Sequence, residues 1–181
     1  MVHRPSSTNY LYGIYRGPAQ TSPDYPAYRV AMALVGSELA RTVREERGLS
    51  YVAYAPIEDR AVAMGGLYAS ATLPTLVIAL MRQAVEGVRT ARIPEITMQR
   101  FVHHYVTAYY ADNETNGAQA DEIARATLFL GDPRATARAA AAFERVTADA
   151  VRHAAVRYLH DVQFVYVGDT LVIRRQNLGG F

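Results

Sequence analysis

Residues 30–35 read Val-Ala-Met-Ala-Leu-Val and are apolar on every side of a helix. The sequence predicts that this helix spans about residues 27–46 and stops at Gly48. A helix that is apolar all round is normally buried between two layers of structure. Its last turns, residues 41–47, are rich in arginine and glutamate. We therefore expect one end of the helix in the core and the other end at a polar surface.

Strand-like segments lie on both sides of this helix. Residues 9–16 are aromatic and β-branched, and Gly17-Pro18 follows them, which predicts a strand that ends there. After the helix, residues 49–55 have strand composition, and a turn leads to a second strand at residues 62–72. Gly65-Gly66 in that strand predicts a bulge or a close backbone approach.

Helices dominate the second half of the chain. Apolar residues recur there at helical spacing. This pattern predicts helices over residues 74–88, 95–111, 118–130 and 134–143, and a last helix that Thr147 caps. Residues 164–167 are a short apolar run and predict a buried strand, whereas residues 171–173 either extend the sheet or lie free of it.

These elements follow the order β-α-β-β-(α)n-β. Because the helices cluster in the middle and do not alternate with strands, the sequence predicts an α+β fold with a mainly antiparallel sheet and helices packed on it. The chain has 181 residues, which is enough for one core without disulfides. We expect a single domain over residues 1–181, with residues 170–181 as a candidate tail.

Composition excludes several classes of function. Cysteine is absent, so disulfides, thiol nucleophiles and thiolate metal sites are excluded. The 19 basic and 17 acidic residues nearly cancel, which leaves no basic excess for nucleic acid, and we expect no nucleic-acid partner. No stretch approaches the roughly 20 apolar residues of a spanning helix, so no membrane span is expected. The first six residues lack the apolar run of a signal peptide.

The five histidines do not form a metal motif. His103 and His104 are adjacent and would point about 100° apart on a helix. His153 and His160 lie two turns apart, about 10 Å along a helix, which is too far for one ion. Neither His-Glu-x-x-His nor the inverted His-x-x-Glu-His occurs. We therefore expect no metal ligands in this chain and no complete catalytic centre.

One group of residues retains a chemical interpretation, and it lies where the long helix passes into the next strand. The segment reads Arg44-Glu-Glu-Arg47-Gly48-Leu49-Ser-Tyr51. Strand alternation predicts Tyr51 on the side of Leu49, with Arg44 near it across the turn. A guanidinium and a phenol held together can bind a peptide backbone or stabilise an oxyanion. The alternative is an arginine in helix-end ion pairs and a tyrosine packed in the sheet.

The pattern Arg44-x-x-Arg47-Gly48-Leu49-Ser50-Tyr51 resembles a characteristic stretch in the zinc-free, non-catalytic domain of insulinase/pitrilysin-type zinc metallopeptidases, the inverzincins. This group includes the mitochondrial processing peptidase and the core subunits of the respiratory bc1 complex. Further pieces resemble the same domain in the same order, from about Tyr10 to Asp169. They are Gly17-Pro18 with residues 23–27, residues 35–40, residues 146–151, and residues 158–159 with 165–169.

The resemblance implies a LuxS/processing-peptidase-like fold and a role. Working enzymes of this group pair two homologous domains around a chamber, and one of them carries His-x-x-Glu-His and zinc. The other lacks zinc ligands and supplies an arginine and a tyrosine. Carried over to this sequence, Tyr51 would donate its hydroxyl to the scissile carbonyl, as the catalytic contribution of this half. Arg44 would bind the substrate backbone together with Tyr51. No cofactor is expected on this chain, and zinc is expected on the partner half.

Three functions therefore stay open. The first is the substrate-binding half of a zinc endopeptidase, inactive alone, with a zinc-bearing domain and a peptide as partners. The second is a non-enzymatic structural or peptide-binding subunit of the same fold. The third is a stand-alone hydrolase that uses His103 or His153. The compartment is undecided, and the resemblance favours the periplasm over the cytoplasm if the source is bacterial.

Overall fold

The sheet is the centre of the structure, a computed structural model that describes residues 1–181. Its strands are β1 (Val2–His3), β2 (Asn9–Ala19), β3 (Ala53–Tyr54), β4 (Ile57–Glu58), β5 (Val62–Ala71) and β6 (Gln163–Gly168). They lie in the order β1-β6-β2-β5-β3, and β4 also pairs with β5. Only β1 and β6 run parallel; the other pairs are antiparallel. The expected α+β class with a mainly antiparallel sheet is confirmed.

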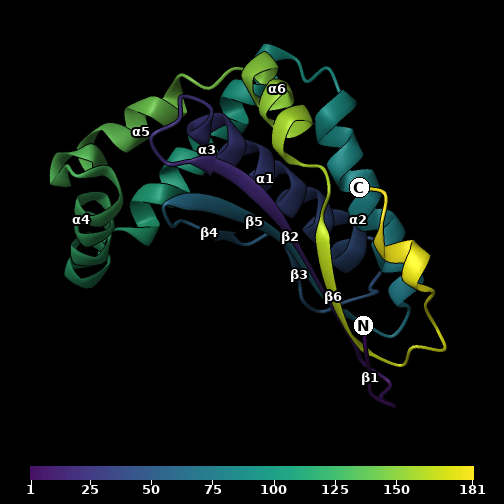
Figure 1. The fold of residues 1–181 in the computed structure, drawn as a ribbon. Coiled ribbons are helices and arrows are strands. Elements are labelled where there is room, and N and C mark those ends of the chain that lie inside the picture. Colours follow the sequence, from purple (N-terminus) through teal and green to yellow (C-terminus); the bar gives the residue numbers. More distant parts are fainter.

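The helices pack on one side of this sheet (Figure 1). They are α1 (Tyr25–Leu39), α2 (Pro74–Thr90), α3 (Glu95–Asp112), α4 (Asn116–Leu130), α5 (Thr136–Glu144) and α6 (Ala148–Tyr158), with short 3-10 turns at Pro133–Ala135 and Arg175–Leu178. Thr147 caps α6 through its side chain, as expected. None of the helices combines the length and the hydropathy that a membrane-crossing helix needs.

Helix α1 is sandwiched between the sheet and the other helices, as its all-round apolar sequence predicts. Val30, Ala31, Met32 and Val35 are fully buried there. The helix contacts strands β2, β3 and β5 on one side and helices α2, α3, α5 and α6 on the other. Burial of valine and methionine side chains such as these contributes about 1.5–3 kcal/mol each, so α1 is one of the stabilising elements of the core.

The glycine pair in β5 allows a close approach between the sheet and its neighbours. A Cβ atom at Gly65 would lie 2.7 Å from Met32 Sδ on α1, and one at Gly66 would lie 2.8 Å from Pro56 Cγ. Of the two alternatives for this pair, the close approach is confirmed. The irregularity in the ladder between β2 and β5 lies elsewhere, between Arg16 and Ala19.

Several predicted strand boundaries are wrong for identifiable reasons. Strand β2 continues past Gly17-Pro18 to Ala19, because the proline lies at the register shift, where no ladder hydrogen bond is needed. The strand predicted over residues 49–55 is reduced to Ala53–Tyr54. Strand β6 is not fully buried, since helices cover only one of its faces, and 53 % of Val165 is exposed on the other.

Residues 170–181 fold back onto the domain. Arg82 of α2 donates hydrogen bonds to the carbonyl oxygens of Asn177, at 3.2 Å, and Gly179, at 2.7 Å. Its guanidinium carbon lies 4.9 Å from the centroid of the Phe181 ring, and that ring is buried. Residues 171–173 do not extend the sheet, although Ile173 is buried. The candidate tail is therefore packed against α2 and β6.

Candidate functional site

Helix α1 does not end at Leu39 but continues as a π-helical turn, Ala40–Glu45. The Glu46 N–H donates to the Arg41 carbonyl at 2.9 Å, five residues back, which is the π-helical pattern. The Leu49 N–H then donates to the Val43 carbonyl, also at 2.9 Å. Between them Gly48 has a φ of +58°, a left-handed conformation that glycine adopts most readily. The chain therefore leaves the helix in a tight turn toward β3.

This turn brings Arg44 and Tyr51 together. The guanidinium carbon of Arg44 lies 5.2 Å from the centroid of the Tyr51 ring, which is cation–π distance. Both side chains are exposed, and 82 % of Tyr51 is accessible to solvent. Hydrogen bonds and ion pairs within the chain reach neither the guanidinium nor the phenol. Their donors are therefore free for a ligand.

The helix-end ion pairs that formed the alternative interpretation belong to another arginine. Arg41 donates to the two carboxylate oxygens of Glu38 at 3.0 and 2.6 Å and also pairs with Glu46. The hydrogen bond to Glu38 raises the pKa of the Arg41 guanidinium above its ordinary value, and the negative charge of Glu38 raises it as well. Arg44, three residues on, points to Tyr51 instead. Arg41 is therefore paired locally at the helix end, whereas Arg44 has no hydrogen bond or ion pair within the chain.

The predicted orientation of Tyr51 is wrong. Strand alternation put it on the side of Leu49 and Ala53, but Ala53 is buried and Tyr51 points outward. The cause is Ser50, a buried serine to which sequence reasoning assigned no role. Its hydroxyl accepts from the Val52 N–H at 3.1 Å and lies 2.6 Å from two carbonyl oxygens. Serine hydroxyls commonly hold such turns, and this is the one signal that the sequence offers.

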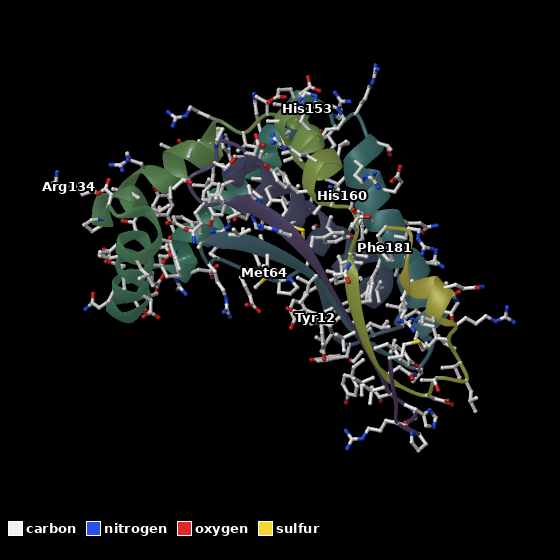
Figure 2. The ribbon with its side chains drawn as sticks, viewed as in Figure 1. Tyr12, Met64, Arg134, His153, His160 and Phe181 are labelled. Atoms are coloured by element: carbon white, nitrogen blue, oxygen red, sulfur yellow. The ribbon has the colours of Figure 1, made fainter.

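The histidines are not brought together. His153 lies in the middle of α6 and His160 just beyond its last residue (Figure 2), and His103 lies on the exposed side of α3. No group of three histidine, aspartate or glutamate side chains in residues 1–181 could hold a metal ion. His160 is engaged locally, with Asp161 at 2.9 Å and with the Arg157 carbonyl at 2.9 Å. The residues of this chain therefore do not fit a zinc site.

A second polar region lies between α1, β4, α3 and α4, around a cavity of about 550 Å³. Its charges largely pair with one another: Arg29 binds Asp59 at 3.0 Å, and Arg125 lies 3.8 Å from Glu122. Burial, together with Glu122, raises the pKa of Tyr109 to about 12. Most charged groups of this region thus have partners within the chain, in contrast to the exposed pair at Arg44.

Comparisons with known proteins concern the fold. No family model and no curated protein matches the sequence. Many solved structures share the fold, among them three that overlap almost the whole chain. One is a chain of Complex III2 from Candida albicans with Inz-5 bound, at 16 % identity and a TM-score of 0.82, covering 98 % of this chain and 47 % of that one.

The second is the peptidase M16 inactive domain from Pseudomonas fluorescens, at 17 % identity and a TM-score of 0.74, covering 93 % of this chain and 42 % of that one. The third is a protease from Helicobacter pylori, at 15 % identity and a TM-score of 0.74, covering 92 % and 43 %. The chain thus spans less than half the length of each. At these identities the likeness establishes the fold, and it confirms at that level the resemblance to the zinc-free peptidase domain.

Proposed function

We propose that this chain is the substrate-binding, zinc-free half of a zinc-dependent endopeptidase and is inactive alone. The observation that carries the proposal is the exposed Arg44–Tyr51 pair, whose donors have no partner within the chain. The pair stands on the fold of a peptidase inactive domain, which supports the assignment. Zinc and its His-x-x-Glu-His ligands belong to the partner half in this proposal.

The two side chains have complementary tasks. The Tyr51 hydroxyl donates a hydrogen bond to the scissile carbonyl oxygen as negative charge develops on it. The Arg44 guanidinium presents several N–H donors in one plane, which suits a neighbouring backbone carbonyl and fixes the register of the peptide. Zinc on the partner half would activate water and polarise the carbonyl. This chain contributes position and hydrogen bonds, and these act only when both halves enclose the peptide.

A non-enzymatic subunit of the same fold is the second candidate. That reading expects both side chains buried or engaged in local pairs. The exposure of Tyr51 and the free guanidinium of Arg44 favour the peptide-binding role. The stand-alone hydrolase has no support from the scattered histidines.

The test combines this chain with the zinc-bearing chain that carries His-x-x-Glu-His, and the probe is an internally quenched peptide library. Neither chain alone should cleave it, and the mixture should. Tyr51→Phe, which removes one hydroxyl, should lower kcat/KM of the mixture by about 100- to 1,000-fold. Arg44→Ala should lower it as well, chiefly by raising KM, because the arginine holds the ground-state peptide.

Matched controls are available in the chain. Arg47→Ala removes an exposed arginine one turn from Arg44, and Tyr110→Phe alters a tyrosine of α3 that is 60 % exposed. Both should leave kcat/KM unchanged. Wild-type cleavage by the Tyr51→Phe and Arg44→Ala mixtures would contradict the proposal. Stoichiometric zinc in the purified chain would instead favour the stand-alone hydrolase.

A further inference from the structure

The ladder between β3 and β5 is interrupted immediately before Ala53. Ala53 pairs with Ala69 and Tyr54 pairs with Tyr68. The next pair in this register is Val52 with Ser70, and the Ser70 N–H does donate to the Val52 carbonyl at 3.3 Å. In a regular antiparallel ladder, the Val52 N–H would return a bond to the Ser70 carbonyl. That return bond is not formed.

The hydroxyl of Ser50 occupies the place of the missing bond. It accepts from the Val52 N–H at 3.1 Å, and its oxygen lies 2.6 Å from the Ser70 carbonyl oxygen. The hydroxyl is also 2.6 Å from the Val52 carbonyl oxygen, so its single hydrogen serves one of the two carbonyls at a time. A side-chain hydroxyl is thus inserted between two strand backbones.

This insertion decides where Tyr51 points. An uninterrupted strand would place residue 51 opposite Ala71, on the same face as Ala53 and Ala69, and all three alanines are buried under the helices. A side chain on that face would be buried under the helices and could not reach a ligand. Because the chain leaves the ladder at Ser50, Tyr51 is 82 % exposed and lies against Arg44.

We propose that Ser50 is the positioning residue of the Arg44–Tyr51 pair, a role that rests on the proposed peptide-binding function. The serine itself is 6 % exposed and does not reach the ligand side. It acts through the backbone, because it takes the Val52 N–H that would otherwise bind the Ser70 carbonyl and so keeps the phenol beside the guanidinium. The shape of the site is therefore set by one buried hydroxyl.

The test measures the pair directly, by nuclear Overhauser contacts between the Tyr51 ring and the Arg44 side chain in the isolated chain. Ser50→Ala should abolish these contacts while the circular dichroism spectrum stays that of the wild type. Ser50→Thr, which keeps the hydroxyl, should retain them. Ser70→Ala is the matched control: it removes a hydroxyl that forms no hydrogen bond and keeps the carbonyl that Ser50 binds, so the contacts should persist.

Wild-type contacts in Ser50→Ala would overturn the proposal. If that variant fails to fold, Ser50→Cys, which keeps the size but weakens the hydrogen bonds, should show weakened contacts, and unchanged contacts there would overturn it equally. The readout needs no zinc half. Lost contacts in Ser50→Ala with unaffected cleavage in Tyr51→Phe would therefore disprove the proposed function and leave the positioning role standing.

Discussion

Two arginine–tyrosine groups lie at opposite ends of the first helix and differ in whether their donors are already used. In the closed group, Arg29 forms an ion pair with Asp59 at 3.0 Å and donates to the Tyr25 hydroxyl at 3.3 Å, and 21 % of the Arg29 and Asp59 side chains is exposed. In the open group, Arg44 has only the face of Tyr51, and both side chains are exposed.

The difference teaches how one pair of residue types is held in internal contacts at one place and left exposed, with unused donors, at another. The Arg29 guanidinium also lies over the rings of Tyr105 and Phe143, at 6.0 and 5.4 Å from their centroids. Burial raises the pKa of Tyr25 far above its ordinary value, although Arg29 acts in the opposite direction. The closed group is therefore a packed ion-pair site, whereas the open group keeps its hydrogen bonds available for a ligand.

Removing the two arginines should give the largest contrast. Arg29→Ala leaves the Asp59 carboxylate without its counter-charge in a mostly buried position, and it should lower the free energy of unfolding by about 3 kcal/mol. Arg44→Ala removes an exposed side chain with one ring contact and should cost less than about 0.5 kcal/mol. Urea denaturation of both variants measures the difference. Equal losses would mean that the open group is structural.

Tyr109 lines the polar cavity beside Arg29 and should make the stability of the chain depend on alkaline pH. Its pKa is raised to about 12 in the folded chain, so its contribution to stability is complete below about pH 10 and is lost as the pH rises to about 12. The loss should reach about 1–2 kcal/mol after allowance for solvent screening. Tyr109→Phe should be spared this loss. The test is the free energy of unfolding of the wild type and of Tyr109→Phe, measured between pH 9 and 12. Parallel curves for the two proteins would contradict a contribution from Tyr109.

Much of the fold follows from patterns local in the sequence. The all-round apolar run at residues 30–35 requires burial on every side, and α1 is indeed enclosed. The helical spacing in the second half places α2 to α6 to within a few residues. The spacing of Arg44 and Tyr51 across a glycine turn left two arrangements open, a contact between the two side chains or separate local pairs, and the structure has the contact.

What the sequence could not supply depends on contacts between distant residues. The direction of Tyr51 is set by Ser50 binding the carbonyl of Ser70, twenty residues on, so alternation within the local strand gave the wrong face. The closed group joins Arg29 to Asp59 across a still longer separation, and a single arginine in an apolar helix does not reveal its partner. Strand β1 is two residues long and exists only because β6 lies beside it.

The smallest expected effect concerns the backbone that presents the open group. Gly48 has a φ of +58°, and a Cβ atom there would meet no neighbour, so Gly48→Ala introduces conformational strain alone. It should cost about 1 kcal/mol. Gly87→Ala in α2, where a Cβ is equally unobstructed but the backbone is helical, should instead gain about 0.5–1 kcal/mol. Thermal unfolding should therefore shift in opposite directions for the two variants. If Gly48→Ala is as stable as Gly87→Ala, the turn that carries Tyr51 can relax without strain. The backbone would then not fix the position of the open group, whereas the ion pair of Arg29 and Asp59 fixes the closed group.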